Sequence, residues 1–182
     1  MADNIQRMKI ISIGGNIFGA DKYVIPLYQR AFAWEDKEVE QMIDDILNFT
    51  TNNYYLGTLI VDKRKDGKYE VIDGQQRLTA LYLLLTALEI PFDDKAVSFE
   101  YRQKSDDTLS RLKVDEQTNW RQSADEDILS GFDTITKKIA SKINDVLKIK
   151  KQLRKVSLVR VIVPPNTDLN KYFEIMNNRA EQ

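Results

Sequence analysis

The chain has 182 residues, of which 42% are hydrophobic and 30% charged, a composition typical of one globular domain with its own core. Its 27 basic and 28 acidic residues give a formal net charge of −1, so no global field draws it to DNA or to an anionic membrane. It has neither cysteine nor histidine, which excludes thiol chemistry, a Ser-His-Asp triad, a His- or Cys-ligated zinc site and an HNH-type nuclease base.

The first half of the chain predicts a strand, a helix, a hairpin and a second helix. Residues 18–25 have strand composition and run into Pro26, whose ring favours an extended residue before it. Residues 35–49 predict an amphipathic helix whose apolar stripe is Val39, Met42, Ile43, Ile46 and Leu47. Two alternating segments, 54–63 and 68–72, flank Asp66-Gly67 and predict a hairpin. Residues 75–89 are apolar almost all round, which is typical of a buried helix.

The second half is dominated by one long periodic segment. Residues 96–102 predict a strand, whereas 103–124 are polar and carry no clear pattern. Apolar residues recur at steps of three and four from 125 to 151, which predicts a single long helix there. Residues 156–163 have strand composition and end at a proline pair, and Asp168 is placed to cap a helix that runs through Asn177. We expect a strand-rich core from about 15 to 90 and from 156 to 182, with a helical insertion from about 103 to 153.

The junction at residues 71–80 has the character of an anion site. A strand ends there and a helix begins at Gly74-Gln75-Gln76, so free amide groups and the positive end of the helix dipole meet at one point. Arg77 adds a fork of donors suited to phosphate, and Asp73 can serve as an acceptor, a helix N-cap or a water-bridged metal ligand. The competing interpretation is structural, since Asp-Gly before a helix is often a cap and a turn.

A nucleoside triphosphate site needs cations for phosphate, oxygen ligands for Mg²⁺ and a group that orients water. The sequence supplies candidates for each, although every one of them can also be an ordinary paired or solvated residue. For catalysis we single out Asp73, also the metal candidate, and Gln75; Glu174 is a weaker Mg²⁺ candidate. The nucleotide-binding candidates are Gln29, Arg30, Gly74, Gln76, Arg77, Thr79, Asn177 and Arg179. No Gly-x-x-x-x-Gly-Lys-Ser/Thr pattern occurs, so the chain is not a P-loop NTPase.

Three segments in order resemble the N-terminal domain of GmrSD-type restriction endonucleases: 25–34 (IPLYQRAFAW), 55–59 (YLGTL) and 73–79 (DGQQRLT). Residues 172–179 resemble that family's Asn-x-Arg-Gly block, with Ala180 in the glycine position. The resemblance implies a ParB/sulfiredoxin-like α+β fold, a small mixed sheet with packed helices, that binds and hydrolyses nucleoside triphosphates with Mg²⁺. It also implies coupling to a C-terminal nuclease domain that acts on modified DNA.

Two functions from different classes follow from these patterns. The first is an NTP-binding and NTP-hydrolysing regulatory domain of a modification-dependent restriction enzyme in phage defence; the second is a non-enzymatic DNA-binding or partner-docking module. DNA cutting by this segment itself is disfavoured because it has no histidine and no dense acidic cluster. With no signal peptide and no span-length apolar run, we expect a cytoplasmic N-terminal fragment of a longer protein, with no membrane partner.

One further segment is a basic run. Residues 148–155 hold five positive charges, at Lys148, Lys150, Lys151, Arg154 and Lys155. Such a run can contact a DNA backbone, or it can simply complement the negative end of a helix. At the end of one long helix the second interpretation is the simpler, and we prefer it here.

Overall fold

The computed structural model describes residues 5–12, 15–113, 119–165 and 167–168. It contains a mixed six-stranded sheet in the order β1-β8-β5-β6-β4-β7, with helices packed on it, and so confirms the predicted α+β class. The strands of this sheet are β1 (Ile5–Lys9), β4 (Tyr23–Ile25), β5 (Tyr54–Lys63), β6 (Tyr69–Asp73), β7 (Val97–Phe99) and β8 (Val156–Ile162). A separate two-stranded ribbon pairs β2 (Ile11–Ser12) with β3 (Gly15–Asn16).

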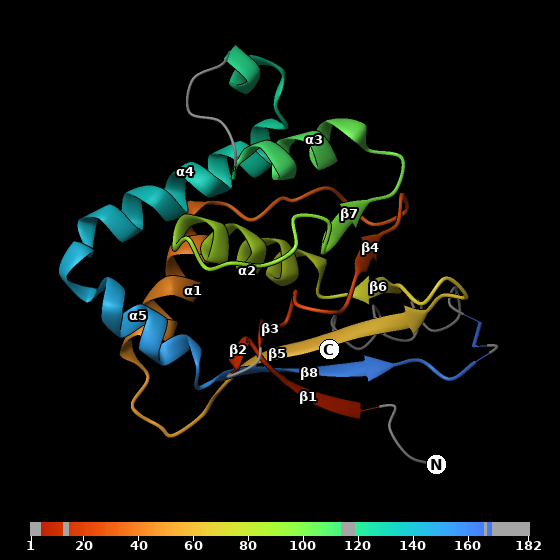
Figure 1. Ribbon diagram of the computed structural model, residues 1–182, viewed down its shortest axis with the longest axis horizontal. Coiled ribbons are helices and arrows are strands. Elements are labelled where there is room, and N and C mark those ends of the chain that lie inside the picture. The colour runs from red at the N-terminus through yellow and green to blue at the C-terminus, as the bar shows by residue number, and fades with distance from the viewer. Residues whose placement is uncertain (1–4, 13–14, 114–118, 166, 169–182) are drawn as a thin grey trace.

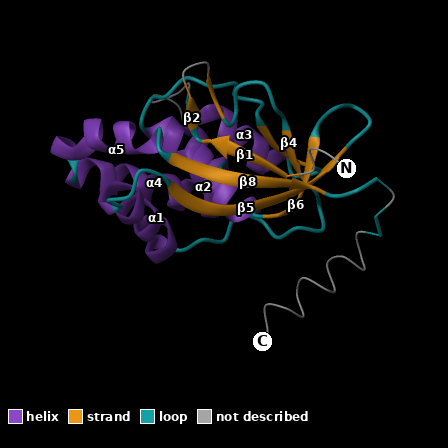
Figure 2. Ribbon diagram, turned by 90° about the horizontal axis from the view of Figure 1, so that it is seen from below, coloured by secondary structure: helices purple, strands orange, loops and turns teal. Residues whose placement is uncertain are grey.

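The helices gather on one face of the sheet, above the strands in Figure 1. Figure 2, seen from below, shows β1, β8 and β5 in front of the helices. The helices are α1 (Asp36–Asn48), α2 (Gln75–Ala87), α3 (Gln103–Arg111), α4 (Glu126–Ser141) and α5 (Val146–Leu153), with the short 3-10 turns η1 (Asn119–Ser123) and η2 (Ile143–Asp145). Within the described residues, no helix combines the length and the apolar character that a bilayer crossing requires.

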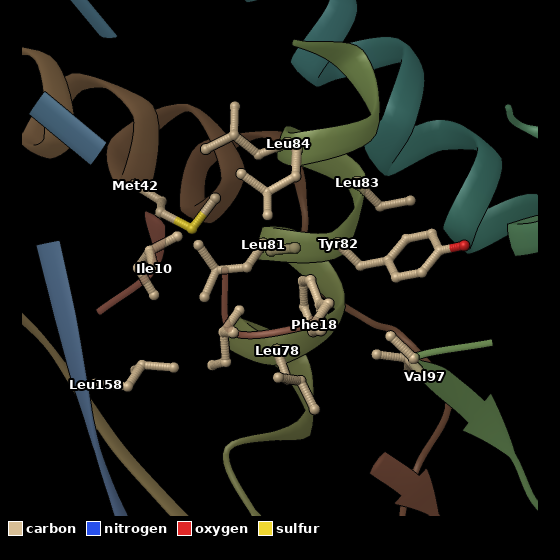
Figure 3. Packing of buried hydrophobic residues seen from close by; sticks show 14 of the residues in the cluster. Ile10, Phe18, Met42, Leu78, Leu81, Tyr82, Leu83, Leu84, Val97 and Leu158 are labelled. Carbon is tan, nitrogen blue, oxygen red and sulfur yellow. The ribbon is translucent and has the colours of Figure 1, made fainter. Parts of the chain in front are cut away.

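The core forms around α2, as the apolar sequence of this helix predicts. Most of its residues are buried, and it packs directly on α4. Figure 3 shows Leu78, Leu81 and Leu84 of this helix packing beside Phe18 and residues of the sheet and of α1. All five residues of the predicted stripe of α1 are buried, and Glu35 and Glu38 form a capping box at its start.

The direction of the strands brings three strand ends to one edge of the sheet. β4 lies between β6 and β7 and is parallel to both, with Tyr23 opposite Tyr69 and Val97. The carboxyl ends of β4, β6 and β7, at Ile25, Asp73 and Phe99, therefore point the same way. We call this region the carboxyl edge; it includes the start of α2, which follows β6 directly.

The prediction of a single long helix over residues 125–151 is wrong, because the structure has two helices there. α4 ends at Ser141, the chain turns through η2, and α5 begins at Val146. Ile143, which keeps the apolar spacing, is 68% exposed. Ser141, Asn144 and Asp145 are short polar residues that compete with a helical backbone, which accounts for the break.

Other differences concern shorter elements. Only Tyr23–Ile25 of the predicted strand at 18–25 is a strand, and only Val97–Phe99 of that at 96–102. The polar region from 103 contains α3, and β1, which precedes the predicted core, pairs antiparallel with β8. The hairpin of β5 and β6 is confirmed, with Gly67 at a positive φ of 84° in its turn. The helix predicted at 168–177 lies outside the described residues.

Candidate functional site at the carboxyl edge

Three separate segments of the sequence meet at the carboxyl edge. The loop 26–35 follows β4, the start of β5 lies beside α2, and residues 73–79 join β6 to α2. These segments overlap the three stretches of sequence that resemble the restriction endonuclease domain. They hold one another through hydrogen bonds from side chains to main-chain atoms.

Gly74 makes the sharp turn from β6 into α2. Its φ of 94° is in the left-handed region, where only glycine is unstrained, and a Cβ atom there would lie 3.0 Å from the Thr58 carbonyl oxygen. Gly74 is also the N-cap of α2, so the possibility that Asp73 caps this helix is wrong. Among the residues that the structure describes, no side chain caps the start of α2, so none of them competes with a ligand for its first amides.

Gln76 fixes the loop that carries Arg30. Its side chain is 7% exposed and bonds to the loop twice: Oε1 accepts from the Ala33 amide at 2.8 Å, and Nε2 donates to the Ala31 carbonyl at 2.8 Å. Gln29 makes a similar link, since its Nε2 donates to the Ile72 carbonyl at 2.6 Å. Both glutamines were predicted to bind nucleotide, and in this structure their amide groups bind main-chain atoms.

Arg102 is a residue of this region that the sequence analysis does not identify. Its Nη2 donates to the Leu27 carbonyl at 3.0 Å and to the Gln29 carbonyl at 2.5 Å, so it holds the same loop from the end of β7. Its partners lie more than 70 residues away in sequence. No local pattern signals such a contact, and only the strand order brings the two together.

Phe32 anchors the loop on the helical side. Its side chain is buried, and a Cβ atom at Gly131 of α4 would lie only 2.5 Å from its ring. Gly131 therefore makes room for the phenyl ring. Gln29, Phe32, Gln76 and Arg102 thus all hold the loop 26–35.

Arg77 lies against the start of β5. Its Nη1 donates to the Thr58 carbonyl at 3.3 Å, and a Cβ atom at Gly57 would come within 2.7 Å of its guanidinium. Gly57 has a φ of 141° and sits where the pairing of β5 with β8 shifts register. Gly57 leaves room for the guanidinium, and within the described residues one long hydrogen bond engages only one of its five N–H donors.

Arg30 and Asp73 differ from these neighbours because both are exposed. Among the described residues, no side-chain hydrogen bond or ion pair engages either of them. Gln75 is nearly buried in the first turn of α2, and Thr79, 1% exposed, faces the interior behind it. The predicted Asn177 and Arg179, with Glu174, lie outside the described residues.

A small charged network borders the site on the other face of the sheet. Arg64 pairs with Glu70 at 2.7 Å and with Glu100 at 3.1 Å, and the Tyr28 hydroxyl donates to Glu70 at 2.7 Å. Partial burial and the bond to Glu70 both raise the pKa of Tyr28 above its ordinary value, so the phenol stays protonated. Across the described part of the chain, no group of three or more acidic residues is placed to hold a metal.

A cavity of about 280 Å³ lies elsewhere, between α3 and η1. Lys104, Arg111 and the buried Trp120 line it, and none of the predicted site residues that the structure describes does. Thr108, which also lines it, uses its hydroxyl to donate to the Lys104 carbonyl and to accept from the Asp125 amide.

The structure thus defines an α+β domain whose polar motif residues converge where parallel strands end and a helix begins. The chain matches the family model of the GmrSD restriction endonuclease, N-terminal domain, over residues 14–182. It belongs to this family and is a component of a restriction endonuclease system. A comparison with curated proteins finds no match.

Proposed function

We propose that the chain binds a nucleoside triphosphate at the carboxyl edge and hydrolyses it, as the regulatory domain of a modification-dependent restriction endonuclease. One observation carries the proposal: the start of α2, which has no side-chain cap among the described residues, carries Arg77, directly follows the exposed Asp73, and is bonded through Gln76 to the loop that holds the exposed Arg30. Ligands of open α/β sheets bind outside the carboxyl ends of the strands, which is where these groups lie.

The phosphates are assigned to the amides of Gly74, Gln75 and Gln76 and to the guanidinium groups of Arg30 and Arg77. The amides carry the positive end of the helix dipole and need no capping side chain to be displaced. Arg30 is the more accessible cation, because Arg77 is partly buried against Gly57. Gln29 and Gln76 serve this site by holding the Arg30 loop, and Thr79 supports it from inside the helix.

Asp73 and Gln75 are assigned to the reacting end of the ligand. One exposed carboxylate suits Mg²⁺, which keeps several waters and takes its other ligands from phosphates. Mg²⁺ would neutralise charge on the phosphates. Asp73 would orient it through water or accept a proton from the attacking water, and Gln75 would help to position that water. Closure of the site by Asn177 and Arg179 stays a prediction.

Isothermal titration with each nucleoside triphosphate, with and without Mg²⁺, tests the proposal. We expect Arg30→Ala to weaken binding at least about tenfold, the scale of a lost charge-assisted phosphate contact. Arg111→Ala, which removes an exposed arginine of α3, is the matched control and should bind like wild type. Asp73→Asn should reduce phosphate release more than affinity. Absence of binding for all four nucleotides would refute the site.

DNA cutting is assigned to a C-terminal nuclease domain that this chain would regulate, acting on modified DNA. The alternative is a non-enzymatic DNA-binding or docking module that uses nucleotide only as a switch. Saturable nucleotide binding without Mg²⁺-dependent phosphate release would favour that alternative.

A further inference from the structure

A second charged surface lies on α5, and it involves none of the carboxyl-edge residues. Residues 142–155 contain six basic residues and one acidic residue in a chain whose overall net charge is −1. Ile149 and Leu153 bury one side of α5, which packs on α1. Leu147, Lys151 and Arg154 follow one another at helical spacing on the opposite side, flanked by Lys148. We call these four residues the exposed α5 face.

The break between α4 and α5 changes how this basic run must be explained. In one long helix all five cations of 148–155 would lie near the C-terminus, where they complement the helix dipole. In the structure α5 begins at Val146, so Lys148 lies in its first turn, where the dipole disfavours a cation. Helix electrostatics therefore accounts for Lys150, Lys151, Arg154 and Lys155, which lie at or just beyond the C-terminus of α5, and leaves Lys148 unexplained.

A second observation concerns the ion pairs of this run. Among the described residues, none of the five forms an ion pair with a carboxylate. Lys138 at the end of α4 provides the contrast, because it pairs with Glu40 at 3.3 Å and Asp44 at 2.7 Å and so links α4 to α1. A row of uncompensated cations on one helix face is the electrostatic signature of a polyanionic partner.

We propose that the exposed α5 face binds the phosphate backbone of duplex DNA. DNA is the polymer on which a restriction endonuclease acts, and this family supplies that context. The composition of the face also favours DNA over an acidic protein. Protein interfaces are enriched in aromatic residues and arginine and depleted of lysine, whereas the face has two lysines, one arginine and no aromatic residue, and Lys150 and Lys155 flank it in sequence. Lysine contacts phosphate as a mobile point charge without reading sequence.

Fluorescence anisotropy of a labelled random-sequence duplex, without nucleotide, tests the proposal independently of the carboxyl edge. We expect the triple variant K148Q/K151Q/R154Q to bind at least about tenfold more weakly at low salt, with the slope of log K against log salt reduced by about 0.9 per lost contact. The matched control K37Q/K65Q/K104Q removes the same net charge from exposed positions on α1, the β5–β6 turn and α3. It should keep most of the affinity and the slope.

Equal losses in the two triple variants, or no DNA binding by the wild type, would overturn the proposal. Leu147 and Ile143 are 81% and 68% exposed and lie beside the cations. I143Q/L147Q should change DNA affinity less than about twofold, since phosphate contacts dominate such binding. Tighter binding of polyglutamate than of the duplex, abolished by I143Q/L147Q, would instead assign the face to an acidic protein partner. Circular dichroism spectra of each variant should match that of wild type, which checks that the fold is retained.

Discussion

The carboxyl edge and the exposed α5 face both collect polar residues, but they use them in opposite ways. At the carboxyl edge the side chains of Gln29, Gln76 and Arg102 form hydrogen bonds with main-chain carbonyls and amides. On and directly after α5, no cation of 148–155 has a carboxylate partner among the described residues. The first region is built to hold a loop in one position, and the second presents charge to solvent.

This contrast separates motif residues that shape a site from those that can touch a ligand. Gln76 and Arg30 belong to one sequence-predicted set, yet one is buried in two main-chain bonds and the other is exposed. Mutation of Gln76 should therefore lower the stability of the fold and shift the loop. Mutation of Arg30 should weaken ligand binding and leave stability unchanged.

The largest effect is expected for Gln76→Ala. Removal of the amide leaves the Ala31 carbonyl and the Ala33 amide without their partner, and the two lost hydrogen bonds cost about 1–3 kcal/mol together. Urea denaturation measures this loss, and Gln75→Ala is the neighbouring control, expected to cost less than half as much. Equal losses at the two glutamines would show that Gln76 is not a specific clamp.

Gly131→Ala should have the next largest effect. A Cβ atom would overlap the Phe32 ring and force the loop or α4 to move, a cost of about 1–3 kcal/mol that the better helix propensity of alanine reduces by about 1. The exposed Ser130→Ala on the same helix is the control. We expect the thermal midpoint to fall only for Gly131→Ala; a rise in that variant would contradict the close packing of Phe32.

Asp106 allows a smaller, pH-dependent test of the carboxyl edge. Burial raises the pKa of this carboxyl group, although its Oδ1 accepts a bond from the Phe99 amide at 2.6 Å, which acts in the opposite direction. The folded state therefore disfavours the carboxylate, and wild type should lose stability as pH rises through the folded pKa of Asp106. Asp106→Asn keeps an acceptor without the charge. We expect it to be up to about 1 kcal/mol more stable than wild type at neutral pH, with the difference disappearing at acid pH.

The smallest stability effect is expected on α5. Because none of its cations has a carboxylate partner in the part of the chain that the structure describes, the variant K148Q/K151Q/R154Q should unfold within about 0.5 kcal/mol of wild type. A loss of 2 kcal/mol or more, on the scale of about two lost hydrogen bonds, would show that these residues serve the fold. The side chains of both regions would then contribute to stability, and the contrast drawn between them would not hold.

Sequence pattern predicts the elements whose signals are local. The stripe of α1, the turn at Gly67 and the apolar α2 each lie within one short segment, and all three are confirmed. The break after Ser141 could not be predicted from periodicity, since Ile139, Ile143 and Val146 keep helical spacing across it. β1 was missed because its stability depends on pairing with β8 at the other end of the chain.

The candidate site follows the same division. Gly74 and the start of α2 were predicted because a turn residue stands between a strand and a helix. The strand order of the folded sheet brings Gln76 to a loop some 45 residues away, and it brings Arg102 to Leu27. Such contacts are set by topology, and one sequence does not contain a local signal for them.

The most direct test of the central claim is a crystal structure of the chain with a non-hydrolysable nucleoside triphosphate analogue and Mg²⁺. The account predicts the triphosphate at the start of α2, within hydrogen-bond distance of the amides of Gly74 to Gln76 and of the Arg30 guanidinium. A triphosphate bound elsewhere, such as in the cavity between α3 and η1, would contradict it.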